Sequence, residues 1–89
     1  MPLMEKARQN SVYIHAGSMM EEIPGDERCY NTTVFIGRNG EILAKYRKIH
    51  TFDATLPNGK EIRESRTVSS GSDIVTVQTD LGLFGLSIC

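Results

Sequence analysis

Tryptophan is missing from this chain of 89 residues, and aromatic residues of any kind are few. Three Tyr and three Phe are too sparse to suggest a platform for stacking nucleic-acid bases. Positive charge is not in excess either, because 24% of the residues are charged and the formal net charge is −1. Binding to nucleic acid or to a membrane surface needs a concentrated basic face. Lys45, Arg47 and Lys48 form the densest basic cluster, and we expect neither partner.

Cysteine and long apolar runs are scarce as well. Cys29 and Cys89 are the two cysteines, which fits free thiols in a reducing compartment better than a disulfide framework and favours a cytoplasmic location. No spacing of Cys and His resembles a zinc site. The longest apolar stretch, near residues 81–89, is too short to span a bilayer, and the first residues lack the apolar segment of a secretion signal.

The pattern of apolar residues predicts a short helix followed by strands. Leu3, Met4 and Ala7 have helical spacing. Alternation and β-branched residues predict strands over 11–16, 30–36, 41–46 and 74–79, and a final buried strand over 81–89. Gly17-Ser18 is expected to close the first strand.

Two connections stand out between these elements. Asn39-Gly40 predicts a type I′ hairpin turn, because both residues tolerate positive φ. Residues 51–73 lack periodicity and predict a long loop, which inside a compact domain is usually functional or disordered.

Three residues in these elements suggest catalysis by a thiol. A thiolate at Cys89, on the end of an apolar strand, is a strong nucleophile when a base or a cation stands near it. Lys48, directly after another predicted strand, can stabilise a developing oxyanion, and Glu64 can hold that lysine protonated and oriented. Each residue also has a plainer interpretation: Cys89 as a small core residue, Lys48 as a solvated strand end, Glu64 as a surface carboxylate.

The two histidines suggest no catalytic role. His50 is interpreted as a hydrogen-bonded structural residue rather than a base. His15, in the middle of a predicted strand, has no partner that the sequence identifies.

The order of the motifs adds specific information. From Val12 onward the chain carries, in order, Gly17-Ser18-Met19-Met20-Glu21, Tyr30-Asn31-Thr32, Lys45-Tyr46-Arg47-Lys48-Ile49-His50, Phe52-Asp53, Glu64-Ser65 and Gly85-Leu86-Ser87-Ile88-Cys89. Cys89 lies 41 positions after Lys48 (89 − 48), and Glu64 lies 16 positions after it (64 − 48). This series resembles the central part of the nitrilase superfamily, the carbon–nitrogen hydrolases, and most resembles its omega-amidase-like and aliphatic amidase branch.

The resemblance implies a catalytic role for the same three residues. Cys89 matches the family's nucleophile, Lys48 its catalytic lysine and Glu64 its second glutamate. The implied activity is hydrolysis of a small-molecule amide to a carboxylate and ammonia through a cysteine thioester, without a metal or organic cofactor. Glu21 is interpreted as structural rather than as the family's general base.

The resemblance also implies the fold. We expect residues 1–89 to be an incomplete central part of a single carbon–nitrogen hydrolase domain. That domain is an α/β fold, an α-β-β-α sandwich, and this chain is expected to contribute a strand-rich fragment of it with one short N-terminal helix. The family's general-base glutamate is expected upstream of Met1, and the segment after the cysteine contributes to its oxyanion hole. We therefore expect residues 1–89 alone to be inactive, and the parent protein to be a homo-oligomer.

Other functions stay open at this level. Within the superfamily the alternative is an N-carbamoyl amide hydrolase. Outside enzymes, the chain is either a non-catalytic β-rich binding module or a catalytically dead piece that acts through oligomer contacts.

Overall fold

The structure is a computed structural model that describes residues 2–88. In chain order the elements are α1 (Pro2–Asn10), β1 (Ile14–Glu22), β2 (Cys29–Ile36), β3 (Ile42–Arg47), β4 (Asp53–Thr55), β5 (Glu61–Arg63), the 3₁₀ helix η1 (Glu64–Arg66), β6 (Val68–Ser69), β7 (Thr76–Thr79) and β8 (Gly82–Gly85). The predicted strand-rich chain with one short N-terminal helix is confirmed. Within residues 2–88, no helix is long and apolar enough to cross a membrane.

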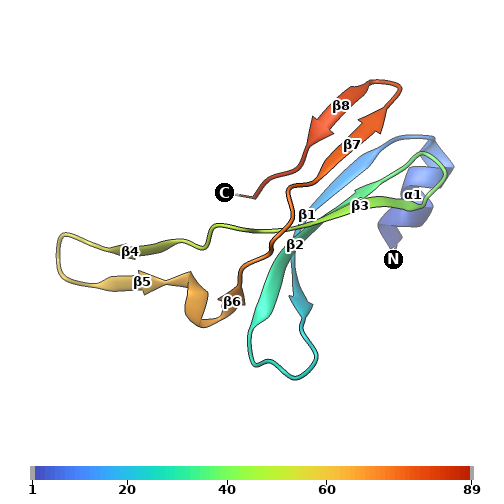
Figure 1. Cartoon of the computed structure of the whole chain (residues 1–89). Helices are drawn as coiled ribbons and strands as arrows, with labels where there is room; N and C mark the ends of the chain where they lie inside the picture. The colour runs from blue at the N-terminus through green and yellow to red at the C-terminus, as the bar shows by residue number, and fades with distance from the viewer. Residues whose placement is uncertain (1, 89) are drawn as a thin grey trace.

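A four-stranded sheet forms the centre of the molecule (Figure 1). β1, β2 and β3 pair antiparallel in that order. β6 pairs parallel with the first residues of β2, at Cys29 and Tyr30, which lie beyond the last β2–β3 pair, Thr32 with Arg47. One edge of β2 therefore pairs with β3 along most of its length and with β6 at its first two residues. The chain leaves the sheet directly after Arg47.

Alternation along β2 sends side chains to two different layers. Val34 and Ile36 pack with Ala7 of α1 on one face, and Phe35 packs with Val77 of β7 on the other. Because successive side chains of a strand point to opposite faces, α1 and the β7–β8 hairpin must cover opposite sides of the sheet. Residues 2–88 thus form three layers: helix, sheet and second pair of strands.

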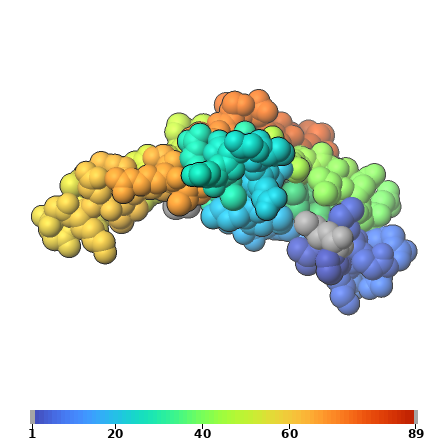
Figure 2. Space-filling view, turned by 90° about the horizontal axis from the view of Figure 1, so that it is seen from below, coloured from blue at the N-terminus to red at the C-terminus, as the bar shows by residue number. Residues whose placement is uncertain are grey.

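The β4–β5 hairpin projects from this layered part as an arm (Figures 1 and 2). The principal extents are 49 × 29 × 22 Å and the Cα radius of gyration is 15.6 Å. A compact domain of this length has a radius of gyration of about 12 Å. The chain is therefore markedly elongated, and its apolar surface is incompletely covered.

The turn between β2 and β3 differs from the predicted type I′. Gly40 has φ of 82°, but Asn39 is absent from the residues with positive φ, which the type I′ turn requires. The Gly37 amide donates to the Glu41 carbonyl at 2.8 Å and the Gly40 amide to the Gly37 carbonyl at 2.9 Å. These bonds close a three-residue loop with one left-handed glycine, a common alternative hairpin.

The first strand also differs from the prediction. The sequence predicts that this strand ends at Gly17-Ser18. Instead, β1 begins at Ile14 and continues through both residues to Glu22. The register between β1 and β2 shifts between Ala16 and Met19. The glycine therefore marks a β-bulge rather than a turn, and the pairing resumes beyond it.

Residues 51–73 are not the featureless loop that the sequence predicts. They hold β4, β5, η1 and β6, and the β4–β5 turn places Gly59 at φ of 83°. Each strand has only two or three residues, too few for apolar alternation to reveal it.

The final strand is shorter and more exposed than predicted. β8 covers Gly82–Gly85, and Leu81 and Leu83 are each 65% exposed, whereas Leu86 is buried.

Gly71 provides a test of this packing. A Cβ at Gly71 would collide with the Arg47 carbonyl oxygen and lie 2.7 Å from the Arg47 Cβ, whereas a Cβ at Gly85 meets nothing within 4 Å. We predict that Gly71→Ala lowers the free energy of unfolding by about 1–3 kcal/mol. Gly85→Ala changes it by less than about 0.5 kcal/mol. Urea unfolding followed by far-UV circular dichroism measures both, and equal effects would contradict the close approach.

Candidate active site

Lys48 lies where β3 leaves the sheet. Its backbone N–H donates to the Asn31 carbonyl at 2.8 Å, and its carbonyl accepts from the Gly71 N–H at 2.8 Å. Its side chain is only 5% exposed. The prediction of a lysine directly after a strand is confirmed, and the plainer interpretation, a solvated strand end, is wrong.

Glu64 supplies the counter-charge for Lys48. The Lys48 Nζ donates to the Glu64 Oε1 at 2.8 Å, and the Glu64 side chain is 23% exposed. A buried ammonium carries a desolvation penalty of several kcal/mol unless a well-placed carboxylate compensates it. The pair therefore joins η1 to the end of β3 across the base of the β4–β5 arm.

A second donor fixes the glutamate carboxylate. The Phe52 N–H donates to the same Glu64 Oε1 at 2.8 Å, and the Glu64 N–H donates to the Phe52 carbonyl at 3.1 Å. The hydrogen bond from Lys48 is the largest influence on Glu64 and lowers its pKa, with the Phe52 N–H acting in the same direction and burial opposing them. Glu64 is therefore an ionised acceptor at neutral pH and a weak base.

The third predicted residue, Cys89, lies outside the residues that the structure describes. The run that leads to it lies on the sheet face opposite α1, where Leu86 and Ile88 pack with Phe35 and Tyr46. Of the predicted trio, the structure therefore brings Lys48 and Glu64 into contact, and the role of each residue stays a prediction.

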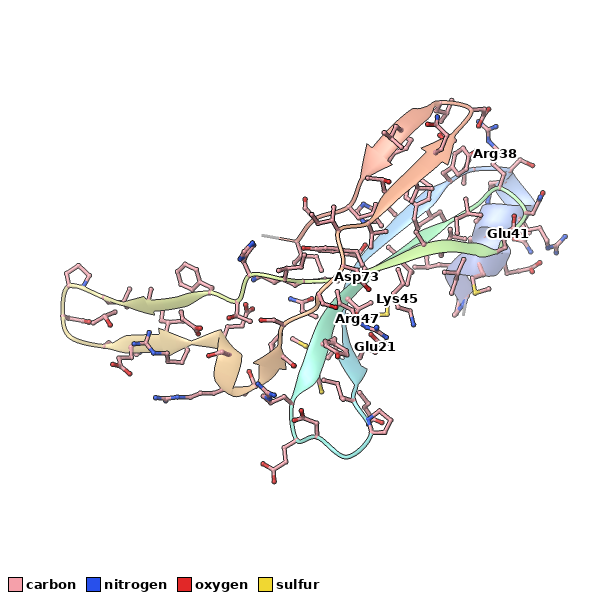
Figure 3. The ribbon with its side chains drawn as sticks, in the orientation of Figure 1. Glu21, Arg38, Glu41, Lys45, Arg47 and Asp73 are labelled. Carbon is pink, nitrogen blue, oxygen red and sulfur yellow. The ribbon has the colours of Figure 1, made fainter. Side chains whose placement is uncertain are left out.

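Glu21 lies on the other face of the sheet. Its carboxylate accepts from Arg47 at 2.8 and 3.0 Å, from Thr32 at 2.9 Å and from Lys45 at 3.1 Å. Figure 3 shows Glu21, Lys45 and Arg47 gathered beside the sheet. These donors, Arg47 first, lower the pKa of Glu21 to about 2. A carboxylate with so low a pKa is a poor proton acceptor, in agreement with the structural interpretation of Glu21.

The two histidines, His15 and His50, differ in their surroundings. A ring nitrogen of His15 pairs with the Thr33 hydroxyl across β1 and β2, a partner that the sequence did not identify. His50 is exposed in the segment between β3 and β4.

Asp53 is the residue near the site that sequence reasoning overlooked. Its carboxylate accepts the Ser65 N–H, the Ser65 hydroxyl and the Thr51 hydroxyl at 3.1, 3.1 and 3.2 Å. Its place in Phe52-Asp53, close behind His50, was the available signal.

Two hollows of the described surface lie away from Lys48 and Glu64. One of about 410 Å³ is formed by residues 22–29, and one of about 290 Å³ lies over β1, β2 and β3 beside Glu21 and Lys45. Neither includes Lys48 or Glu64. Within residues 2–88, no group of three or more His, Cys, Asp or Glu side chains is arranged to hold a metal ion.

Comparison with known proteins decides the family. Residues 1–89, the whole chain, match the family described as carbon–nitrogen hydrolase. This chain belongs to the carbon–nitrogen hydrolase family. The human protein named omega-amidase NIT2 is 42% identical over 87 residues, which are 98% of this chain and 31% of the human protein. The chain thus spans about 30% of the length of the curated relatives that it matches.

Solved structures of the family have the same arrangement. The Caenorhabditis elegans NitFhit protein superposes with a TM-score of 0.87 at 31% identity, over 99% of this chain and 22% of the other. Saccharomyces cerevisiae Nit3, a member of branch 10 of the nitrilase superfamily, gives 0.79 at 30% identity, over 98% of this chain and 28% of the other. The predicted superfamily, its amidase branch and the α-β-β-α type of fold are confirmed.

The ion pair generates one prediction. In Lys48→Met, Glu64 loses its strongest donor, so the pKa of the Glu64 carboxyl should rise. Carbon-13 NMR titration of the carboxyl groups measures it. Lys45→Met is the matched control, because Lys45 pairs with Glu21. An unchanged Glu64 titration in Lys48→Met would show that the pair does not form.

The Glu21 cluster generates a second prediction. Because the folded-state pKa of Glu21 is lowered from 4.5 to about 2, its contribution to stability is present above about pH 4.5 and is lost as the pH falls toward 2. Glu21→Gln should therefore lose less stability than the unsubstituted chain between pH 5 and pH 3. Urea midpoints at the two pH values test this, with Glu22→Gln as control. An equal loss in Glu21→Gln and the unsubstituted chain would contradict it.

Proposed function

We propose that residues 1–89 carry the nucleophile, the cation and one carboxylate of an amide hydrolase, which are Cys89, Lys48 and Glu64. One observation carries the proposal: the Lys48 ammonium is buried at a strand end and held by Glu64 at 2.8 Å. A cation fixed in a poorly solvated place is suited to stabilising negative charge that develops on a reacting carbonyl oxygen. The names of the relatives, omega-amidases, support an amide as the substrate.

The reaction proceeds in two steps. The Cys89 sulfur attacks the amide carbonyl carbon, and the Lys48 ammonium stabilises the oxyanion of the tetrahedral intermediate. The carbon–nitrogen bond breaks, the thiol proton leaves with the nitrogen as ammonia, and a thioester remains. Water then attacks the thioester carbon, which releases the carboxylic acid and regenerates the thiol.

The proton transfers need a base other than Glu64. Glu64 is committed to Lys48 and the Phe52 N–H, and its lowered pKa makes it a weak base. The two hollows described above, that of residues 22–29 and that over β1, β2 and β3, do not include Lys48 either. We infer that the base and the wall of the substrate pocket come from outside residues 1–89, and that residues 1–89 alone do not turn over an amide.

A chimera tests the proposal. Residues 1–89 replace the matching segment of human omega-amidase, and ammonia release from a short aliphatic amide is measured. We predict turnover by the folded chimera and a loss of at least about a hundredfold in Cys89→Ala and in Lys48→Met. Cys29→Ala is the matched thiol control and should retain turnover.

Mass spectrometry of the quenched chimera should detect the acyl group on the peptide that contains Cys89. Turnover that survives Cys89→Ala would contradict the thioester route. Turnover by residues 1–89 alone, lost in Cys89→Ala, would contradict the need for a further base.

A further inference from the structure

The base of the β4–β5 arm is held together by side chains as well as by strand pairing. β4 and β5 exchange only three residue pairs, and the first of them, Asp53 with Arg63, lies next to Glu64. Beyond that pair, Asp53 Oδ1 accepts both the N–H and the hydroxyl of Ser65, each at 3.1 Å. Asp53 Oδ2 accepts the Thr51 hydroxyl at 3.2 Å.

These bonds enclose Glu64 from both sides. Its own backbone N–H is bound to the Phe52 carbonyl, and the residue that follows it, Ser65, is bound to Asp53. In return, the Phe52 N–H is bound to the Glu64 Oε1. The backbone on either side of the Glu64 Cα is thereby fixed relative to residues 52 and 53, and this leaves the carboxylate few positions other than the one that meets Lys48.

We propose that Asp53 is a positioning residue of the proposed active site, which sets the place of the Glu64 carboxylate beneath Lys48 by binding Ser65. The expected effect of Asp53 on turnover rests on the proposed function. The expected effect of Asp53 on the Glu64 carboxylate depends on the described residues alone.

Removing the charge of Asp53 and removing its hydrogen bonds to Ser65 are predicted to change the pKa of the Glu64 carboxyl in opposite directions. The negative charge of Asp53 by itself raises the pKa of Glu64, whereas the bonds from Lys48 and Phe52 lower it. In Asp53→Asn the side-chain oxygen still accepts from Ser65 but the charge is gone, so the pKa of Glu64 should fall. In Asp53→Ala the acceptor is lost as well, Glu64 moves from its donors, and its pKa should rise.

Carbon-13 NMR titration of the Glu64 carboxyl measures this difference in sign, in the chain of residues 1–89 or within the chimera. Hydrogen exchange of the Phe52 amide gives a second readout. It should become about fivefold faster in Asp53→Ala, the effect of losing one hydrogen bond, and stay near the unsubstituted rate in Asp53→Asn.

Asp26→Ala is the matched control. Like Asp53, Asp26 accepts a backbone N–H, but its donor is Arg28, two residues ahead at 2.8 Å in the loop between β1 and β2. It should change neither the Glu64 titration nor the Phe52 exchange.

Turnover of the chimera completes the test. We expect kcat to fall about tenfold to a hundredfold in Asp53→Ala, with KM changed less than kcat, and Asp53→Asn to restore most of it. A fall in the Glu64 pKa in both variants would show that Asp53 acts only as a nearby charge and would overturn the proposal. An inactive unsubstituted chimera that still shows opposite titration shifts would overturn the proposed function and leave the positioning role intact.

Discussion

A buried ammonium is the constraint around which this part of the chain is organised. Lys48 is 5% exposed, and an unpaired charge in that position costs several kcal/mol. Glu64 compensates that charge by accepting from its Nζ, while Asn31 and Gly71 hold its backbone in place. The β4–β5 arm, which contributes little to the core, brings Glu64 back to the sheet edge. The arm is thus better understood as a support for one carboxylate than as a packing element.

The layers explain why this site lies where it does. α1 covers the face of β2 that carries Val34 and Ile36, and the β7–β8 hairpin covers the face that carries Phe35. Lys48 follows β3 and lies between Asn31 of β2 and Gly71, just past the end of β6. The run 86–88 packs on the Phe35 face. The superposition on NitFhit and Nit3 shows that this arrangement occurs within larger proteins, of whose chains the matched part is 22% and 28%. Leu83 of β8 and Leu81 just before it stay exposed on the β7–β8 hairpin.

Sequence reasoning predicted the elements that follow regular patterns. β2 is rich in β-branched and aromatic residues and β3 alternates, and the strand-end position of Lys48 follows from β3. The contact between Lys48 and Glu64 was suggested by residue chemistry and supported by a family resemblance, because sixteen positions of irregular sequence contain no periodic signal. The bulge at Gly17, the turn at Asn39 and the short arm strands depend on backbone conformation and on pairing partners distant in sequence. The exposure of β8 was mispredicted because an apolar run does not reveal whether a neighbouring layer exists. The contacts of Asp53 were missed because the pair Phe52-Asp53 does not reveal that Ser65, twelve positions later, lies within reach.

A double-mutant cycle between Lys48→Met and Glu64→Gln tests directly whether the ion pair organises the site. The free energies of unfolding of the parent, both single variants and the double variant are measured in urea within one protein background. Glu64→Gln should destabilise more than Lys48→Met, because it leaves the more deeply buried charge unpaired. The double variant should cost less than the sum of the singles by about 1–3 kcal/mol. Additive costs, within about 0.5 kcal/mol, would contradict the pair as the organising interaction.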